Sequence, residues 1–297
     1  MIAPDILCIG SVLWDVIGRA PVHMRTGSDV PGRITRVPGG VAMNIAMTLA
    51  RFGLRPALLS CIGDDAQGKA LAAEAKRLGL ITDHLHVSSD LPTDIYMAIE
   101  GANGLIAAIA DAHSLEQADA RILAALEDGR LGSAAAPHAG PIALDGNLTP
   151  QLLSRIAASP LFAAADLRVA PASPGKAERL LALLGHPHVT LYVNLEEAGL
   201  LCQTSFTDAA AGAEALLARG ARRVLVTDGG RRAAEATAGQ GTIDADPPEV
   251  LVTRVTGAGD TFMAAHIASE IKGMGREAAL ENALCVAARY VSGEPPA

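Results

Sequence analysis

The chain has 297 residues; half of them are apolar and 19% are charged, so a large hydrophobic core can be buried. Aromatic residues make up only 3%, which predicts a core of aliphatic side chains. The formal net charge of −8 argues against a nucleic-acid polymer or an anionic membrane as the partner, although backbone amides can still bind a small anion.

Four scattered cysteines form no CxxC pair and no metal-ligand spacing, so we expect reduced thiols in a cytoplasmic protein. The start, "MIAPDILCIG", lacks the basic and apolar regions of a signal peptide. No uninterrupted apolar run reaches about 18 residues, so no membrane span is expected.

Short β-like runs alternate with helical runs from the N-terminus. The clearest helix covers 41–53, where Val41, Ile45 and Leu49 recur at helical spacing and Gly53 ends the segment. In chain order, the pattern predicts a strand at 5–10, a strand at 33–40, this helix, a strand at 55–63 and a helix at 66–79.

The segment 84–109 has a different pattern. Two strand-like runs flank Gly101-Ala102-Asn103-Gly104, which is typical of a β-hairpin. Together with residues 12–38, this segment is expected to form a small accessory sheet, a lid outside the main layers.

The alternation resumes at residue 114 and predicts one α/β domain over 1–297. The expected elements are a helix at 114–129, strands at 141–146, 167–171, 189–194 and 222–230, helices at 149–159, 175–185, 194–202 and 207–219, an antiparallel region at 233–253 and final helices from Gly257 and Arg276. Repeated β-α alternation indicates a largely parallel sheet with helices on both faces. Ligands of such sheets bind where strands end and helices begin.

The run "TRVTGAGDTF" at 253–262 is the first candidate site. Gly257, Ala258 and Gly259 are small enough for their backbone N–H groups to approach a phosphate at a helix N-terminus. Asp260 would repel that anion unless it accepts a proton from an attacking hydroxyl. The alternative is an ordinary N-terminal cap. The run is not GxGxxG, so a dinucleotide fingerprint is a poor match.

The run "PGGVAMNIA" and an upstream aspartate are candidates for binding an acceptor. Gly39 and Gly40 permit a close approach of a ligand, and Asn44 lies one turn into the following helix. Asp15 lies in an otherwise apolar strand, and its carboxylate could accept hydrogen bonds from both hydroxyls of a vicinal diol. A tight turn with a solvent-facing Asn44, and turn chemistry at Asp15, are the alternatives.

Two further runs suit a nucleotide and its metal. Asn194 and Glu197 in "VNLEEAG" share one helix face and could hold water on Mg²⁺, whereas a capping box or a solvated face is the alternative. "VTDGG" places Thr227 beside Gly229, where a hydroxyl and glycine amides could hold a phosphate, or where the chain simply turns.

In this order, these motifs resemble the ribokinase-like (PfkB) family of sugar and nucleoside kinases over nearly the whole chain. The resemblance implies a three-layer α/β/α sandwich with a small β-sheet lid, and ATP with Mg²⁺ as cofactors. It implies action on a small nucleoside or sugar. If the lid strands expose an apolar face, pairing with a second copy would cover it, so a homodimer is expected. The implied roles are a general base at Asp260, an anion hole at Gly257, Ala258 and Gly259, ribose contacts at Asp15, Gly39, Gly40 and Asn44, water-mediated Mg²⁺ at Asn194 and Glu197, and ATP contacts at Thr227, Gly229, Gly257 and Asn282.

Within the family, several stretches are most similar to pseudouridine kinases. They are "GSDVPGRITRVPGGVAMNIA", "TDIYMAIEGANGLIAAIADA", "LDGNLT" and "TRVTGAGD". This similarity implies phosphorylation of a C-nucleoside at its 5′-hydroxyl. Ser28, Asp29, Thr93 and Asn147 are polar residues in these neighbourhoods that would read the base or close over it.

The sequence departs from the family pattern at three positions. Arg254 stands where the family often has Asp or Asn tied to a monovalent-cation loop, which puts potassium activation in doubt. Arg232 replaces a second glycine of the nucleotide loop, and His266 replaces a commonly apolar residue of the helix.

Other functions stay open at this point. Ribokinase, adenosine kinase and fructokinase activities are the alternatives within the family. A nucleoside-binding regulator without catalysis would keep the pocket but consume no ATP, and the retained Asp260 counts against it. A dinucleotide-dependent oxidoreductase would fit the α/β alternation, but the early GxGxxG is missing.

Overall fold

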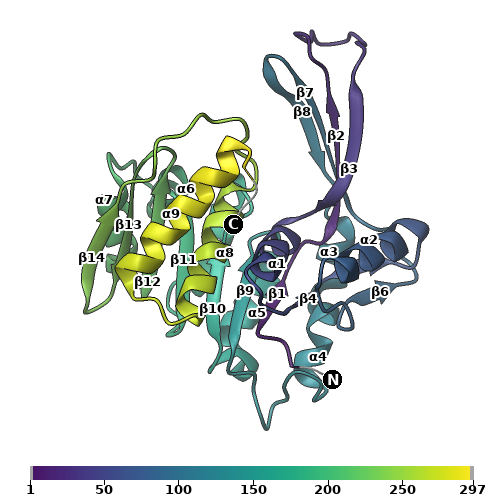
Figure 1. Ribbon diagram of the computed structural model, residues 1–297. Coiled ribbons are helices and arrows are strands. Elements are labelled where there is room, and N and C mark those ends of the chain that lie inside the picture. Colours follow the sequence, from purple (N-terminus) through teal and green to yellow (C-terminus); the bar gives the residue numbers. More distant parts are fainter. Residues whose placement is uncertain (1–2, 295–297) are drawn as a thin grey trace.

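The computed structural model describes residues 3–294, which form a three-layer body and a projecting sheet (Figure 1). The body contains an eight-stranded sheet in the order β14-β13-β12-β11-β10-β9-β1-β4. All its pairs are parallel except β12–β13 and β13–β14. The strands are β1 (Ile6–Ile9), β4 (Pro56–Leu59), β9 (Pro141–Asp145), β10 (Asp166–Ala170), β11 (Val189–Asn194), β12 (Arg223–Asp228), β13 (Arg231–Thr237) and β14 (Gly241–Ala245).

Helices cover both faces of this sheet. One face carries α1 (Val41–Arg51), α2 (Ala66–Arg77), α8 (Ala258–Ile271) and α9 (Arg276–Ser292). The other carries α3 (His113–Ala118), α4 (Ala124–Glu127), α5 (Pro150–Ala158), α6 (Leu195–Cys202), α7 (Ala209–Ala218) and the 3₁₀-helices η1 (Asp119–Leu123), η2 (Pro160–Phe162) and η3 (Pro174–Leu183). The predicted α/β sandwich is therefore present.

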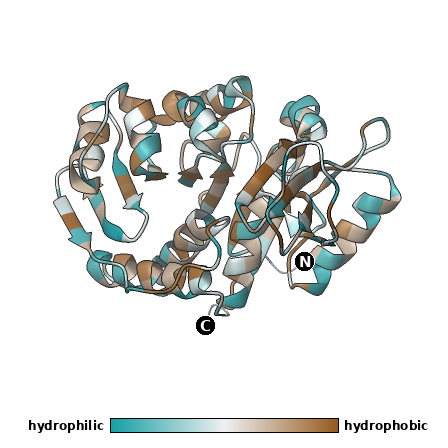
Figure 2. Cartoon of the chain, turned by 90° about the horizontal axis from the view of Figure 1, so that it is seen from above, coloured by the Kyte–Doolittle hydropathy of each residue, from teal (hydrophilic) through white to brown (hydrophobic). Residues whose placement is uncertain are grey.

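The core lies in two layers, one on each side of the sheet. Successive strand residues point to opposite faces, so Leu7 and Ile9 of β1 pack into one layer, whereas Ile6 and Cys8 pack into the other. All four residues are buried, which explains why β1 is a continuous apolar run rather than an alternating one. Figure 2 shows hydrophobic segments concentrated on the strands between the helical layers.

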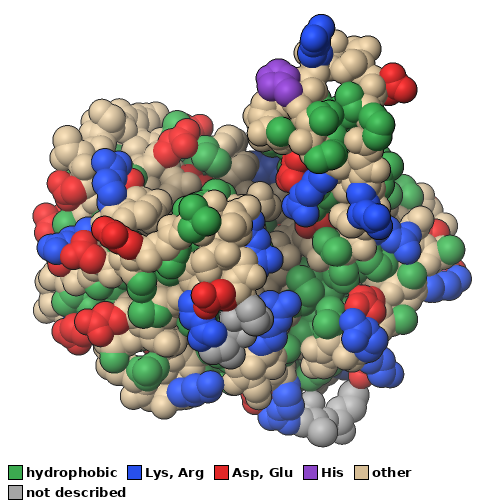
Figure 3. Space-filling view, turned by 45° about the horizontal axis from the view of Figure 1, so that its top comes forward, with side chains coloured by type: hydrophobic (Ala, Val, Ile, Leu, Met, Phe, Trp, Pro, Cys, Tyr) green, Lys and Arg blue, Asp and Glu red, His purple; other side chains and the backbone are tan. Residues whose placement is uncertain are grey.

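The accessory sheet projects from the body at one end of β1 (Figure 1). Its four strands follow the order β3-β2-β7-β8. They are β2 (Leu13–Arg19), β3 (Arg33–Gly39), β7 (Ile95–Gly101) and β8 (Gly104–Ala110), and β7–β8 form the predicted hairpin. Hydrophobic side chains gather on the projecting sheet (Figure 3). Of the residues in its strands, Ile34 and Ile109 are 77% and 70% exposed.

The structure differs from the expected elements at 84–94, 114–129 and 175–185. Residues 84–94 lie outside the accessory sheet, because β6 (His86–Ser88) pairs instead with β5 (Cys61–Gly63) of the body. The single helix expected at 114–129 is divided into α3, η1 and α4, since the chain turns at Asp119, whose φ is 46°. The helix expected at 175–185 is the 3₁₀-helix η3.

In the part of the chain that the structure describes, no helix combines the length and the apolar character needed to cross a bilayer.

Candidate active site

Asp260 lies in the first turn of α8, where its carboxylate contacts a side chain from α1. The helix begins after Gly257, whose φ of 85° is in the left-handed region that favours glycine, and no side chain caps this terminus. Asn44 Nδ2 instead donates a hydrogen bond of 2.9 Å to Asp260 Oδ2. The alternative interpretations of Asp260 as a helix cap and of Asn44 as a solvent-facing residue are therefore wrong.

The backbone amides before Asp260 are only partly free. Ala258 N–H donates to the Val255 carbonyl at 3.0 Å. Within residues 3–294, the N–H groups of Gly257 and Gly259 have no hydrogen-bond acceptor. This terminus can thus bind an anion through Gly257 and Gly259, whereas the Ala258 amide is already occupied.

Burial raises the pKa of Asp260 to about 7. The hydrogen bond from Asn44 lowers this pKa, while the charges of Asp145, Asp15 and Glu197 raise it. At neutral pH the carboxylate is therefore near its titration midpoint. That value suits a group that must be ionised to accept a proton and must release the proton after each turnover.

The Asp15 carboxylate lies against Gly39, where the accessory sheet joins the body. A Cβ placed on Gly39 would lie 2.1 Å from Asp15 Oδ2, so only glycine leaves room for this carboxylate. The neighbouring Gly40 has a φ of 94°, and a Cβ there would lie 2.4 Å from the Ser11 carbonyl oxygen. Burial raises the pKa of Asp15 to about 6.

A buried cluster beneath α1 contains functional groups that sequence reasoning missed. Asp145, at the end of β9, accepts hydrogen bonds of 2.7 Å from the backbone N–H groups of Ser11 and Asn147. Ser11 Oγ accepts from the N–H of Val41, the first residue of α1, at 2.9 Å. These contacts fix the start of α1, and with it Asn44, relative to the ends of β1 and β9.

Asn147 links this cluster to a lysine. Its Nδ2 donates to Ser11 Oγ at 3.0 Å, and its Oδ1 accepts from Lys176 Nζ. Both ends of the Asn147 amide are therefore occupied. Ser11 and Asp145 are 134 positions apart, and no local spacing signal connects them.

The nucleotide side contains the capping box that was the alternative at 194–197. Asn194 Oδ1 accepts from the Glu197 N–H at 2.8 Å, and Glu197 Oε2 accepts from the Asn194 N–H at 2.8 Å. Burial raises the pKa of Glu197 to about 7, and the hydrogen bond from Asn194 lowers it. Within residues 3–294, no cluster of at least three His, Cys, Asp or Glu side chains could hold a metal.

These residues still fit a Mg²⁺ ion that takes most of its ligands from water and substrate phosphates. Glu197 Oε1 is not used in the capping box, and Mg²⁺ is commonly held by one or two carboxylates with waters and substrate phosphates. Asn194 and Thr227 are directly opposite each other in the β11–β12 register, so the two predicted nucleotide runs end side by side.

Four other predicted residues form their side-chain hydrogen bonds elsewhere or lie exposed. Ser28 and Asp29 lie exposed in the connection between β2 and β3, and Ser28 Oγ donates to the Arg25 carbonyl. Thr93 is buried, and its hydroxyl bonds to Asp65 and Gly63, which gives it a structural role below the lid.

Asn282 is the fourth of these residues. It donates to Ser269 Oγ at 2.9 Å, between α9 and α8. Ser269 lies nine residues beyond Asp260, or about 14 Å along the helix at 1.5 Å per residue.

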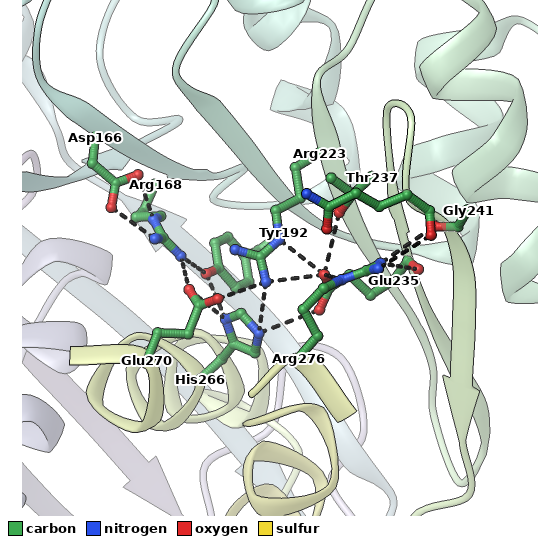
Figure 4. Close-up of polar contacts among 11 residues, drawn as sticks. Asp166, Arg168, Tyr192, Arg223, Glu235, Thr237, Gly241, His266, Glu270 and Arg276 are labelled. Atoms are coloured by element: carbon green, nitrogen blue, oxygen red, sulfur yellow. Dashed lines mark hydrogen bonds and ion pairs between the residues drawn. The ribbon is translucent and has the colours of Figure 1, made fainter. Parts of the chain in front are cut away.

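A buried polar network holds the middle of α8 (Figure 4). His266 is fully buried; its Nδ1 contacts the Tyr192 hydroxyl at 2.9 Å, and its Nε2 lies 3.5 Å from Glu235 Oε2. Arg223 forms ion pairs with Glu235 at 2.9 Å and with Glu270 at 2.7 Å. The network ties α8 to β11, β12 and β13, so the departure at His266 serves the position of the helix that carries Asp260.

Arg254 anchors the loop that precedes α8. Its guanidinium lies 3.8 Å from the centroid of the Tyr290 ring, and its Nε donates to the Tyr290 carbonyl at 2.7 Å. The Tyr290 hydroxyl donates to the Thr256 carbonyl at 2.9 Å. A fixed cation thus lies near the last carbonyls of α9, where a positive charge is favourable.

The model of the pfkB family of carbohydrate kinases matches residues 3–294. The chain belongs to this family. It is 31% identical to the uncharacterized sugar kinase YeiI of Escherichia coli (strain K12), over 96% of this chain and 78% of that protein. It is 28% identical to the pseudouridine kinase of the same organism, over 91% of this chain and 84% of that protein.

The solved structure of Arabidopsis thaliana ribokinase complexed with ribose and ATP has the same fold, with a TM-score of 0.77 and 19% identity over 98% of this chain and 93% of that chain. The ribokinase-like sandwich expected from the motifs is thereby confirmed. As a PfkB kinase, the protein is a phosphotransferase with an alcohol acceptor, and the oxidoreductase alternative is excluded.

Proposed function

We propose that this kinase transfers the γ-phosphate of ATP to the 5′-hydroxyl of a ribosyl substrate, and that pseudouridine is its preferred acceptor. The contact between Asn44 and Asp260 carries the proposal, because it places a carboxylate with a raised pKa beside the unpaired amides of a helix N-terminus. The similarity to a pseudouridine kinase over 91% of the chain supports the choice of acceptor.

The reaction needs a base and an anion hole on the same turn of helix. Asp260 accepts the proton of the acceptor hydroxyl, whose oxygen then bonds to the γ-phosphorus. The bond from this phosphorus to the β–γ bridging oxygen breaks, and its electron pair leaves with ADP. The N–H groups of Gly257 and Gly259 donate to the oxygens of the transferred group, where negative charge must be stabilised.

The acceptor would be held by residues at the root of the lid. Asp15 accepts hydrogen bonds from two hydroxyls of the sugar, and Gly39 and Gly40 let the ring approach the backbone. Asn44 keeps Asp260 oriented toward the remaining hydroxyl. Asn147 is already bound to Ser11 and Lys176, so it supports the residues beneath the acceptor rather than contacting the base directly.

The nucleotide would lie over the ends of β11 and β12. Thr227 and Gly229 contact its phosphates, and Glu197 with Asn194 orients water on Mg²⁺. When bound, the metal ion neutralises charge on the β- and γ-phosphates. Asn282 of α9 is a candidate for the base end of ATP, since its partner Ser269 lies well along α8 from the phosphate end.

The lid would close over the acceptor and exclude water. Ser28 and Asp29 lie in its connecting loop and could contact the base only after such a movement. Pairing with a second lid would cover exposed side chains such as Ile34 and Ile109, so we include a homodimer in the proposal. The reduced thiols expected for this kinase fit a cytoplasmic enzyme.

The test is ATP-dependent phosphorylation of pseudouridine, uridine, cytidine, adenosine, ribose and fructose with Mg²⁺. Preference for pseudouridine supports both the mechanism and the acceptor. Preference for ribose, adenosine or fructose keeps the mechanism and removes the acceptor assignment. Nucleoside binding without ATP consumption on any acceptor contradicts the proposal and favours a regulator.

A further inference from the structure

Lys176 is a half-buried cation at the edge of the candidate site. It lies in the first turn of η3, directly after β10, and its Nζ donates to Asn147 Oδ1. Within residues 3–294 this amide oxygen is the hydrogen-bond partner of the ammonium group, which forms no ion pair with a carboxylate. The direct partner of this charge is therefore a neutral dipole, and the carboxylates of Asp145 and Glu116 act on it only from beyond ion-pair distance.

The partly buried arginines of the same chain are arranged differently. Arg168 pairs with Asp166 and Glu270, and Arg223 pairs with Glu235 and Glu270. A cation that is withdrawn from water without a counter-ion is unfavourable. Burial accordingly lowers the pKa of Lys176, and the charge of Arg179 lowers it further, whereas the more distant charges of Asp145 and Glu116 only partly offset this. An anion arriving at Nζ would remove this cost.

The position of Lys176 indicates which anion would arrive. β10 lies between β9, which carries Asp145, and β11, which ends at Asn194. Lys176 therefore follows β10, the strand that lies between the proposed acceptor site at β9 and the proposed nucleotide site at β11. Its partner Asn147 bonds to Ser11, which in turn fixes the first turn of α1, one turn before Asn44.

The carboxylates of the site would repel a triphosphate, and a cation at this edge would offset that repulsion. Asp260 is surrounded by the charges of Asp145, Asp15 and Glu197, all of which raise its pKa. A triphosphate that approaches this edge meets the same carboxylates. Within residues 3–294, Lys176 is a partly buried ammonium group that forms no direct ion pair with these carboxylates, although the charge of Asp145 acts on it.

We propose that Lys176 is a catalytic residue that binds a non-bridging oxygen of the phosphoryl group in transfer. The inference rests on the proposed function. As the acceptor oxygen bonds to phosphorus and ADP leaves with the electron pair of the broken bond, Lys176 keeps its protons and exchanges the Asn147 oxygen for a phosphate oxygen. Its positive charge stabilises the transferred group, while Asp260 takes the hydroxyl proton.

The first test compares turnover of Lys176→Met and Lys176→Arg with that of a matched control. Lys69→Met is the control, because Lys69 pairs with Asp64 on the exposed surface of α2. Lys176→Met is expected to reduce kcat/KM by at least ~10²-fold, the size of effect seen when one charge-stabilising donor is removed. Lys176→Arg restores part of this loss, and Lys69→Met stays at the wild-type rate.

The second test separates a phosphate contact from a structural effect. A non-hydrolysable ATP analogue and ADP are titrated into wild type and Lys176→Met. Loss of a charged hydrogen bond to the terminal phosphate weakens binding of the analogue by at least ~10-fold and leaves the Kd for ADP unchanged. Equal weakening of both ligands, or turnover near the wild-type rate, overturns the inference.

Two further outcomes are decisive. A rise confined to the KM of the acceptor, with unchanged analogue binding, places Lys176 against the acceptor and overturns the phosphate assignment. If wild type phosphorylates no acceptor, the proposed function fails by itself. The comparison of analogue with ADP then still decides whether Lys176 binds the terminal phosphate, because it needs no turnover.

Discussion

Asn44 and Asp260 are 216 positions apart in the chain, yet Asn44 Nδ2 lies 2.9 Å from Asp260 Oδ2. The contact joins the first turns of α1 and α8 at the carboxyl edge of the sheet. It also leaves the second carboxylate oxygen of Asp260 free to meet a hydroxyl. The predictions below follow from this pair and from the groups that hold it.

Asp260→Asn is expected to reduce turnover by at least ~10²-fold while the protein stays folded, because the amide cannot accept the hydroxyl proton. Initial rates at saturating ATP measure the effect. Asp128→Asn is a suitable control, since Asp128 pairs with Arg130 on the exposed surface after α4. Turnover near the wild-type rate in Asp260→Asn would remove the base assignment.

The activity of the wild-type kinase should rise with pH through a midpoint near the Asp260 pKa of about 7. The hydrogen bond from Asn44 lowers this pKa, so Asn44→Ala should move the midpoint to higher pH. The pH profile of kcat/KM for the acceptor measures both values. Asn103→Ala in the lid hairpin serves as the control, and a midpoint that does not move in Asn44→Ala would sink the idea.

Gly39→Ala should weaken binding of the acceptor, because the new Cβ would lie 2.1 Å from Asp15 Oδ2 and displace the carboxylate. Loss of hydrogen bonds to a charged group predicts a rise in KM for the acceptor of ~10-fold or more, with little change in KM for ATP. Gly185→Ala, which meets no atom within 4 Å, is the matched control. An unchanged KM would contradict the placement of Asp15.

The free energy of unfolding should fall in acid because of the network around α8. Burial alone would raise the pKa of Glu235, but His266, Arg223 and Arg276 outweigh it and lower the pKa from 4.5 to about 2. Burial also lowers the pKa of His266 from 6.5. In both groups the unfolded chain binds protons more readily, so stability is complete above the unfolded pKa and is lost as pH falls.

Urea unfolding at a series of pH values measures this dependence. His266→Leu should remove the part of the loss that begins below pH 6.5. The part due to Glu235 should persist toward lower pH but become smaller, because Arg223 and Arg276 still lower the pKa of Glu235 whereas His266 no longer does. If wild type and His266→Leu lose stability in parallel over the whole range, the histidine is not part of the response.

Turnover should be the same in sodium and in potassium buffers, because Arg254 already supplies a fixed cation at the C-terminal end of α9. Matched assays at equal ionic strength test this expectation. Arg254→Ala removes that cation and should lower turnover through the loop that leads into Gly257. A several-fold activation of wild type by potassium would contradict the prediction.

The sequence predicted the groups whose signal is local. The spacing of Asn194 and Glu197 allowed the capping box that the structure contains, and the glycines around Asp260 indicated a backbone terminus open to an anion. The alternation of strands and helices indicated the sandwich, because parallel strands covered on both faces are apolar throughout.

Groups that depend on distant pairing could not be predicted. Asp145 reads as an ordinary strand end until Ser11 is placed beside it by the β1–β9 pairing. In the sequence, His266 is an unexplained polar residue in an apolar helix, and only the structure shows its contacts with Tyr192 and Glu235. Thr93 shows the opposite error, since its polarity suggested ligand contact but Asp65 and Gly63 occupy its hydroxyl.

The order of the central sheet has a consequence for how the protein forms during synthesis. β4 and β9 pair with opposite edges of β1, and from β10 to β14 each strand is added beside the strand made before it. The sheet can therefore grow in one direction as the chain leaves the ribosome. The helices α8 and α9 come last, so one apolar face of β10–β12 stays uncovered until they arrive. If a ribosome stalls before residue 258, the chain is inactive and exposes an apolar sheet face, which chaperones and proteases would bind.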